Sequence, residues 1–528
     1  MKRVGVLLSC ATLLAAIGGF QHVVGAQSQP RALITEPISD TKLVALAGNT
    51  RPEATAANDR GPVADNFPME HMLLQLRRSP EQEQALDKYI AELEDPRSAN
   101  YHHWLTAQEM REKYGLPAQD IETITNWLKS HGFTINRVYP NGMVIDFSGN
   151  AGEVNEAFHT EIHHLSVNGT MHIANMSDPQ IPAALAVAGV VSLNDFRPPS
   201  RAQINPNYTF GCTNAPFSST CYALAPAVLA TIYNLNPVFT AGISGQKQTI
   251  VVIEESDVYA LSDWSTFRSK FGLSSFTDGS VSQVHPGSCT DPGVVSGAES
   301  EAILDAEWTS AAAPSAAIEL ASCAGTASTS GELLALENLL NTEGAATPAI
   351  VSNSYGAAEA QNGQAFNAAI NSMYQTAEVM DGVSVFVAAG DSAAAYADQG
   401  PVKKGLEPAA SMGIAVNSSA STQYDVAVGG TDFGDTFAGT NSTYWSATNG
   451  TNDGSALSYI PEIPWNDSCA SGLIAGFLGF TTFGSTSLCN NLPMGDSALL
   501  NISGGGGGPS GCATGAPSTP GVVSGTCK

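Results

Sequence analysis

Four short runs of apolar residues in the second half of the chain constrain its fold more than any other feature. They are Gln248–Glu254, Ala317–Ser322, Ala349–Ser354 and Val383–Ala389. Continuous apolar runs of this length are typical of strands that are buried on both faces of a parallel sheet. Segments with helical spacing alternate with them, at Ser262–Phe271, Ser300–Ala312, Gly331–Thr342 and Gln364–Met380. The alternation predicts an α/β domain built on a parallel sheet.

The chain before this domain has a different texture. Residues 61–195 combine amphipathic helical segments, such as Glu81–Leu93, with strand-like segments, such as Met69–Leu76, and predict a separate α+β module. Residues 27–60 lack sustained periodicity and predict a flexible lead-in. Residues 196–207, rich in proline and arginine, predict an exposed connector and processing region, so that residues 208–528 form the second domain.

The first 26 residues predict a secretory signal. Lys2 and Arg3 precede an apolar run that reaches Phe20, and the small residues Val24-Gly25-Ala26 follow as a cleavage site. The alternative, a lipoprotein signal ending at Cys10, is disfavoured because the apolar run continues past that residue. No later stretch is long and apolar enough to predict a membrane span. We therefore expect a secreted, extracellular protein.

Eight cysteines follow the connector, an even number that suits four disulfides in an oxidising compartment. They stand at positions 212, 221, 289, 323, 469, 489, 512 and 527. Pairing between neighbours along the chain is the simplest arrangement, although the spacing leaves other connectivities open. No pair has the C-x-x-C spacing of a zinc site, and the sequence assigns no metal ligand.

Charge separates the two parts of the chain and limits its partners. The formal net charge is -27, which argues against nucleic acid or an anionic membrane as a partner. Eight of the ten histidines fall in the α+β module, at positions 71, 102, 103, 131, 159, 163, 164 and 172. Below about pH 6.5 this module gains positive charge while the second domain stays anionic, so we expect a pH-dependent contact and hypothesise that acid releases the module.

Two carboxylates four residues apart mark the strongest candidate for chemistry. Glu301 and Asp305 lie in the helical segment Ser300–Ala312, where this spacing puts both side chains on one face. Apolar neighbours such as Ile303 and Trp308 indicate that the helix is buried on most sides. A partly buried carboxyl pair shares a proton and can hold one member as a base that the other orients. The alternative is an ordinary solvated acidic face.

Further candidates follow two of the apolar strands. Asp391 comes directly after Val383–Ala389 and Gly390, and Ser354-Tyr355-Gly356 follows the run that begins at Ala349. Functional groups collect at the carboxyl ends of strands in sheets of this kind. The alternative for Asp391 is a helix N-cap, which aspartate often provides.

The ordered combination of these motifs resembles the sedolisin peptidases, the kumamolisin-like serine-carboxyl peptidases. An α+β module comes first, followed by E-x-x-x-D, S-x-G, A-A-G-D-S and V-G-G-T, and residues 101–106 (YHHWLT) resemble the propeptide motif of that family. The resemblance runs from about residue 65 to the end of the sequence. It implies a subtilisin-like catalytic domain preceded by a propeptide of ferredoxin-like topology.

The resemblance also implies roles for individual residues. Glu301 matches the general base, Asp305 the acid that orients it, and Asp391 the protonated acid that donates a hydrogen bond to the oxyanion. One substrate wall would be an edge strand formed by Ser354-Tyr355-Gly356, and Ser503-Gly504-Gly505-Gly506 would form part of the other. The substrates would be proteins or peptides, the propeptide would bind within the same chain, and the protein would be a monomer.

The residue census agrees with acid chemistry on physical grounds. After the connector the only histidine is His285, so a Ser-His-Asp triad has little to draw on. A carboxylate base needs a pKa near the working pH, and an aspartate that serves as an oxyanion donor must be protonated. Both requirements point to activity at acid pH. An unrelated α/β hydrolase is disfavoured because the sequence has no G-x-S-x-G segment.

Two expected parts of such a peptidase have no counterpart in the sequence. The family's nucleophilic serine lies in a G-T-S-x-x-x-P segment, whereas the nearest match here is Gly525-Thr526-Cys527 at the end of the chain. A disulfide role suits Cys527 better than a nucleophilic one. The family's calcium ion would also bind beyond Lys528. We therefore expect a truncated peptidase that is inactive as given, the alternative being a non-catalytic secreted protein that binds polypeptides.

Overall fold

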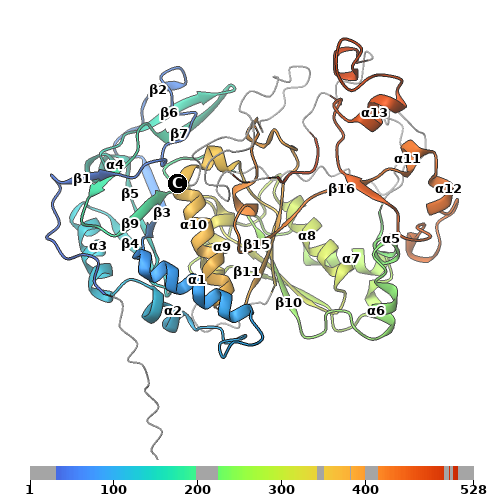
Figure 1. The fold of residues 1–528 in the computed structure, drawn as a ribbon, viewed down its shortest axis with the longest axis horizontal. Coiled ribbons are helices and arrows are strands. Elements are labelled where there is room, and N and C mark those ends of the chain that lie inside the picture. The colour runs from blue at the N-terminus through green and yellow to red at the C-terminus, as the bar shows by residue number, and fades with distance from the viewer. Residues whose placement is uncertain are drawn as a thin grey trace, which may run out of the picture.

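The computed structural model describes residues 31–197, 224–341, 350–380, 382–398, 414–492, 499, 503–508 and 510. The predicted signal segment, most of the predicted connector and four of the eight cysteines (212, 221, 512 and 527) lie outside the described residues. Two parts are distinguished below: the N-terminal module, residues 31–197, and the second domain, from residue 224 onward (Figure 1).

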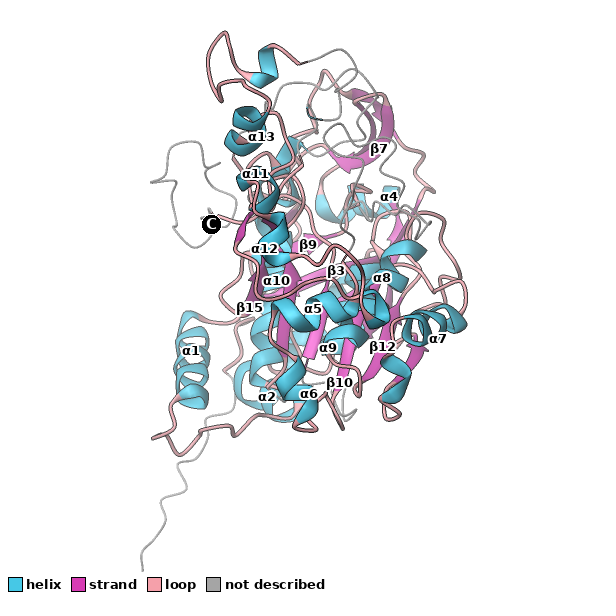
Figure 2. Cartoon of the chain, turned by 90° about the vertical axis from the view of Figure 1, so that its right-hand side faces the viewer, coloured by secondary structure: helices cyan, strands magenta, loops and turns pink. Residues whose placement is uncertain are grey.

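The second domain is built on a six-stranded parallel sheet with the order β11-β12-β10-β13-β14-β15, which confirms the predicted α/β class. Ile250 of the central strand β10 is in register with Ile318 of β12 and Ile350 of β13. Figure 2 shows the strands side by side. Their bounds are Thr249–Glu254 (β10), Ser280–Val284 (β11), Ala317–Ser322 (β12), Ile350–Asn353 (β13), Ser384–Ala388 (β14) and Asp425–Val428 (β15).

Helices cover both faces of this sheet because side chains alternate along its apolar strands. In β10, Val251 belongs to the core shared with α9 and α10, whereas Val252 belongs to the core shared with α7 and α8. Helix α8 contacts β10 and β12 on one face, and α9 contacts the same two strands on the other. The bounds are Leu261–Lys270 (α7), Glu299–Ala312 (α8), Gly331–Leu340 (α9) and Glu359–Val379 (α10).

Short elements complete the second domain. An antiparallel pair, β16 with β17, follows the large sheet. Their bounds are Thr431–Phe433 (β16) and Glu462–Pro464 (β17), and the short helices are Pro226–Ile232 (α5), Asn236–Thr240 (α6), Asp435–Ala438 (α11), Asn441–Tyr444 (α12) and Gly472–Phe477 (α13).

The N-terminal module is an antiparallel α+β unit. Its largest sheet has the order β4-β5-β3-β9, and smaller sheets pair β2-β6-β7 and β1-β8. The strands are Leu43–Ala45 (β1), Asp59–Pro62 (β2), Pro68–Leu76 (β3), Thr134–Val138 (β4), Val144–Asn150 (β5), Ile162–Val167 (β6), Thr170–Asn175 (β7), Gln180–Pro182 (β8) and Val187–Val191 (β9). The helices are Pro80–Glu94 (α1), Ala107–Tyr114 (α2), Ala118–Ser130 (α3) and Ala151–Phe158 (α4).

Capping residues fix where the helices of this module begin. Ser79, Thr106 and Asn150 each form a capping box at the start of α1, α2 and α4. Each side chain accepts a hydrogen bond from the backbone N–H three residues later, and the side chain at that later position accepts one in return. Local sequence therefore sets these boundaries, which explains why the periodicity predicts the helices well.

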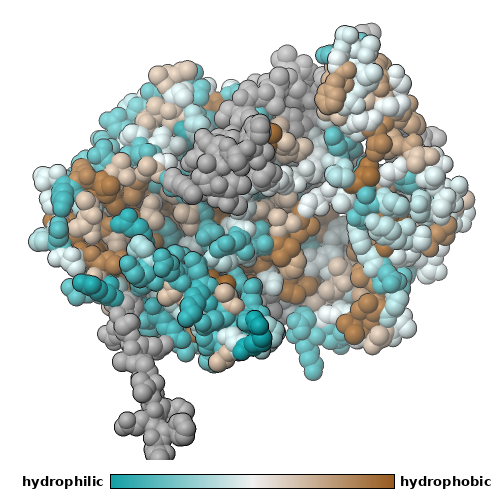
Figure 3. Space-filling model, in the orientation of Figure 1, coloured by the Kyte–Doolittle hydropathy of each residue, from teal (hydrophilic) through white to brown (hydrophobic). Residues whose placement is uncertain are grey.

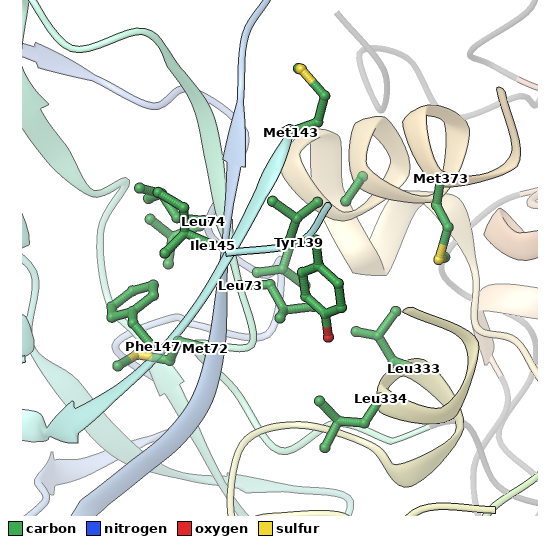
Figure 4. Close-up of a cluster of buried hydrophobic side chains, with 14 of the residues drawn as sticks. Met72, Leu73, Leu74, Tyr139, Met143, Ile145, Phe147, Leu333, Leu334 and Met373 are labelled. Atoms are coloured by element: carbon green, nitrogen blue, oxygen red, sulfur yellow. The ribbon is translucent and has the colours of Figure 1, made fainter. Parts of the chain in front are cut away.

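The two parts share one apolar core, which positions the module against α9 and α10. Leu73 of β3 and Tyr139 lie in the same buried cluster as Leu333 of α9 and Met373 of α10, and Figure 4 shows these side chains facing one another. Polar contacts cross the same boundary: the Thr329 hydroxyl donates to the carbonyl of residue 71 at 2.8 Å. Figure 1 accordingly shows α9 and α10 between the module and the rest of the second domain.

Part of the predicted flexible lead-in is ordered. Strand β1 pairs with β8, so Val44 lies opposite Ile181. The backbone N–H of Leu33 donates to Asp120 of α3 at 2.7 Å, and Asp40 accepts from the Trp127 indole at 3.0 Å. These contacts depend on residues more than 80 positions away, which local periodicity does not reveal.

Two of the neighbouring cysteine pairs are disulfides, as the simplest pairing predicts. Cys289 is bonded to Cys323, and Cys469 to Cys489.

The surface differs between the two ends of the molecule (Figure 3): strongly hydrophilic residues gather over the N-terminal module, while the end with α11 to α13 is paler. Exposed aromatic side chains at that end include Tyr459 and Phe483, which are 56% and 85% exposed.

Candidate active site

The predicted carboxylate pair lies on α8. Glu301 is in the first turn of this helix and Asp305 one turn later, while Ala302 and Ala306 are fully buried against the sheet. The positive end of the helix dipole favours a carboxylate in the first turn, which offsets part of the repulsion between the two acids. The sequence thus places two acids on a helix whose other positions pack tightly.

Asp305 is held by a residue from the neighbouring strand. The Ser354 hydroxyl, which follows β13, donates to Oδ2 of Asp305 at 2.7 Å. Burial raises the pKa of Asp305 to about 6, although the hydrogen bond from Ser354 lowers it. Asp305 is therefore an acid that keeps its proton in mildly acidic solution.

A third carboxyl group, Glu254, belongs to this cluster and was not predicted from the sequence. It is the last residue of β10 and is fully buried, and its Oε2 accepts from the Tyr355 hydroxyl at 2.9 Å. Burial and then the neighbouring charge of Asp305 raise the pKa of Glu254 well above its ordinary value; Glu301 adds to the rise. Its position at the end of the apolar run Gln248–Glu254 is the signal that would have found it.

Two more buried acids lie near the same edge of the sheet. Glu332, in the first turn of α9, accepts from the Asn353 amide at 3.2 Å and from the Ser330 hydroxyl at 3.1 Å. Burial and the charge of Glu332 raise the pKa of Glu255 to about 7, and Arg197 lowers it. The edge therefore concentrates carboxyl groups that favour the protonated form.

The N-terminal module ends at this edge. Phe196 and Arg197, the last described residues of the module, line a cavity together with Glu332 and Gly356. The start of the predicted connector therefore lies beside the S-x-G segment that the sequence analysis assigns to the substrate wall.

Asp391 lies in a tight glycine-dependent loop that follows the next strand, β14. Its side chain is exposed. Gly390 has φ +106°, and a Cβ atom there would lie 1.8 Å from the ring of Tyr396, so no other residue fits. The backbone N–H of Gly504 donates to the carbonyl of Asp391 at 3.0 Å, and that of Gly506 donates to the carbonyl of Gly390 at 2.6 Å.

The structure brings the predicted residues together in two groups. Ser354 contacts Asp305 directly, and the glycine segment that follows Ser503, including Gly504 and Gly505, lies along the Asp391 loop. Strands β13 and β14 are neighbours in the sheet, so both groups lie at the same edge. The roles in catalysis and substrate binding stay predictions.

The S-x-G segment has a structural task of its own. Ser354 and Tyr355 both turn their hydroxyls toward acids, and Tyr355 is buried. The segment also lies just past β13, a central strand that ends at Asn353. A contact with substrate at these positions would therefore come from the backbone.

Among the described residues, one group of three or more His, Cys, Asp or Glu side chains could hold a metal ion: Asp257 with His285 and Asp291. Calcium prefers six to eight oxygen ligands, and the imidazole nitrogen does not fit that preference. The segment around Cys527 lies outside the described residues.

Known proteins match both parts of the chain. Residues 55–196 match the family model described as "Pro-kumamolisin, activation domain". Xanthomonalisin from Xanthomonas sp. (strain T-22) is 32% identical over 101 residues, and sedolisin from Pseudomonas sp. (strain 101) is 24% identical over 211 residues. The chain is similar to these sedolisin peptidases. Residues 55–196 of its N-terminal module are a pro-kumamolisin activation domain.

The matches to these sedolisin relatives are partial. They cover 19% and 39% of this chain, and only 12% and 34% of the two relatives' own lengths. Among solved structures, Pseudomonas sedolisin, a serine-carboxyl proteinase complexed with two molecules of pseudo-iodotyrostatin, is similar with a TM-score of 0.36 and 20% identity. That match covers 57% of this chain and 68% of the other, and a TM-score this low supports no argument here.

In the part of the chain that the structure describes, no helix combines the length and the apolar character needed to cross a bilayer.

Proposed function

We propose that this chain is the zymogen of a secreted serine-carboxyl peptidase that hydrolyses peptide bonds of proteins at acid pH. The observation that carries the proposal is the carboxyl group of Asp305, which is buried beside Glu254, bonded to Ser354 and one helical turn from Glu301. Two carboxyls that share one proton can accept the proton of a nucleophile and return it later. The disulfides and the predicted signal segment support secretion.

The proposed mechanism assigns one proton movement to each residue. Glu301 takes the proton of a serine hydroxyl as its oxygen attacks the substrate carbonyl, and later gives that proton to the leaving amine. Asp305 holds Glu301 in position and stays protonated below about pH 6. Protonated Asp391 donates a hydrogen bond to the oxyanion, as backbone amides do in other peptidases.

The nucleophile itself is not assigned. The sequence contains no G-T-S-x-x-x-P segment, so in this proposal residues 1–528 supply the base, its orienting acid and the oxyanion donor. Calcium is likewise expected for the family, with no ligand assigned in these residues.

The position of the activation domain supports the proposal of a zymogen. Its last described residues line a cavity together with Gly356. We therefore propose that the chain leaving Arg197 blocks substrate until it is cut in the connector, residues 196–207. The proposed active form is a monomer.

A second candidate function follows from the missing motif. Without a nucleophile, the same edge of the sheet would bind polypeptides and release them uncut. Polypeptide binding without hydrolysis stays the alternative function. The sequence suggests it, but no contact in the structure favours it.

The test compares two glutamates of α8 in the full-length protein. Glu301→Gln should lower the hydrolysis of an unfolded protein at pH 4 by about 10²- to 10⁴-fold, the usual value of general acid-base catalysis. Glu299→Gln is the matched control, because Glu299 lies two residues away on the same helix and accepts a hydrogen bond from the backbone N–H of Gly297. Hydrolysis that survives Glu301→Gln would contradict the mechanism, and binding without hydrolysis by the unmodified protein would favour the alternative.

A further inference from the structure

A second cluster of titratable side chains lies at the same edge of the sheet, away from α8. Nε2 of His285 lies 3.1 Å from Oδ1 of Asp257 and 3.8 Å from Oδ1 of Asp291. One potential ligand atom from each residue falls within 4.8 Å of the other two. The proposed peptidase mechanism uses none of these three residues.

Regular elements hold two of the ligands in place. Asp257 follows β10 by three residues, and His285 directly follows β11. The Ser322 hydroxyl, at the end of β12, donates to Oδ1 of Asp257 at 2.6 Å. A carboxylate oriented by a buried hydroxyl is the kind of outer-shell support that metal ligands usually have.

The loop that carries Asp291 is fixed at both sides. The Cys289–Cys323 disulfide ties it to the end of β12. The backbone N–H of Asp257 donates to the carbonyl of Gly293 at 2.9 Å, and that of Val295 donates to the Ser256 hydroxyl at 2.8 Å. The three side chains therefore converge without large movement of the backbone.

The donor set indicates which ion would fit. One imidazole nitrogen with two carboxylates suits zinc and similar transition metals, which commonly take three protein ligands and a water. Ligands about 2.1 Å from a tetrahedral zinc ion lie roughly 3.4 Å from one another, which the two distances from Nε2 bracket. Calcium and magnesium prefer oxygen ligands only.

Exposure gives the ion a path to the cluster. The Asp257 side chain is buried, whereas that of Asp291 is 65% exposed. The two carboxylates of the cluster carry negative charge that a divalent cation would neutralise.

We propose that Asp257, His285 and Asp291 bind a Zn²⁺-type divalent ion, with water as a fourth ligand. The ion cross-links the ends of β10 and β11 to the loop that leads into α8. It therefore stabilises the segment immediately before Glu301 without taking part in hydrolysis.

The test titrates the metal-free chain with Co²⁺ and then Zn²⁺ at pH 7.5, where imidazole is mostly neutral. We expect one equivalent of Co²⁺ to give visible absorption bands of a four- or five-coordinate site, Zn²⁺ to displace it, and the melting temperature to rise with either ion. Ca²⁺ at the same concentration should neither displace Co²⁺ nor give this rise.

Single substitutions locate the site. Ser322→Ala removes the hydroxyl that orients Asp257 and should weaken Zn²⁺ binding roughly 10- to 100-fold. Asp291→Asn and His285→Gln each remove a proposed ligand, so each should weaken Zn²⁺ binding at least as much. His103→Gln is the matched control, because His103 is exposed on the activation domain. Asp291 is exposed, so its variant should fold, which an unchanged melting temperature without metal would check. Failure to bind one equivalent, or binding that persists in both variants, would overturn the proposal and leave His285 as a simple ion-pair partner.

Discussion

The acids that pair with histidines in the activation domain and the acids near α8 in the second domain are held in opposite ways. In the activation domain, histidines pair with carboxylates of the same domain: His71 with Asp146 at 2.8 Å, and His163 with Asp59 at 2.8 Å. In the second domain, Asp305 and Glu254 instead accept hydrogen bonds from the hydroxyl groups of Ser354 and Tyr355.

Both arrangements nevertheless bind protons more tightly in the folded chain. The hydrogen bond with Asp146 raises the pKa of His71, although burial lowers it. Burial raises the pKa of Asp305 to about 6 and, with the charge of Asp146, raises that of Glu337 to about 8. A raised pKa of either kind contributes stability at low pH that is lost as pH rises through it. Histidine–carboxylate pairs and buried carboxyl groups thus both make the folded chain more stable at acid pH.

The contact between the two parts follows the same rule. Glu378 of α10 lies beside Glu94 of α1, and burial followed by the charge of Glu94 raises its pKa to about 7. Glu337, near Asp146, is a second such group across the boundary. Between about pH 8 and pH 4, acid should therefore tighten the docked activation domain. This differs from the hypothesis that protonated histidines release it, because the histidine partners above lie within the module.

The largest effect on stability should come from the hydroxyl that bonds Glu254. Tyr355→Phe removes the hydrogen bond that Oε2 of this buried carboxyl group accepts. The loss should cost about 1–3 kcal/mol in the free energy of unfolding. Tyr139→Phe is the matched control, because the buried Tyr139 hydroxyl has no hydrogen-bond partner in the described part of the chain. Urea unfolding at pH 7 measures both. Equal losses in the two variants would show that Glu254 does not depend on Tyr355.

The second effect is the dependence of stability on pH. The raised pKa values of Asp305, Glu307 (about 7) and Glu337 predict that the melting temperature falls as pH rises from 4 to 8. Glu337→Gln keeps the acceptor for the Asn341 amide, which donates at 2.6 Å, and removes the buried charge. The variant should melt at least about 2 °C higher than the unmodified protein at pH 8 and no higher at pH 4. A protein that is most stable at pH 8 would contradict this comparison.

The smallest effect concerns the ion pair between His71, whose side chain is 32% exposed, and the buried Asp146. Because the pKa of His71 is raised, the pair contributes stability below about pH 6.5, and the contribution is lost as pH rises through the folded value. His71→Gln should cost up to about 1 kcal/mol at pH 5 and nothing measurable at pH 8. Isothermal unfolding at the two pH values checks the difference. A loss of the same size at both would assign the effect to packing instead.

The sequence predicts the strands and helices whose position is set by the local pattern of residues. Apolar runs locate β10, β12, β13 and β14, and the bounds of α2 and α4 agree with their periodicity and caps. Strand β11 (SVSQV) was missed because it is an edge strand with polar residues. Strands β1 and β8 were missed because three residues carry too little pattern.

Within the site, side-chain partners were harder to predict than positions. Glu301 and Asp305 lie on the expected helix, and Asp391 follows the expected strand. The bond from Ser354 to Asp305 and that from Tyr355 to Glu254 depend on how α8 packs across the sheet. The histidines gave the same lesson, since their uneven distribution is a sequence property but their partners are set by the folded module.

The most direct test of the account is the pH dependence of peptide hydrolysis by the processed full-length protein, with and without Asp305→Asn. The account predicts activity that is highest in acid and falls about tenfold per pH unit once the proton of Asp305 is lost, above about pH 6. Asp305→Asn should lower the rate at pH 4 and remove the part of the fall that belongs to the proton of Asp305, while the need for protonated Asp391 remains. A rate that stays constant or rises up to pH 8, or a profile unchanged by Asp305→Asn, would contradict the assignment of the carboxyl pair on α8.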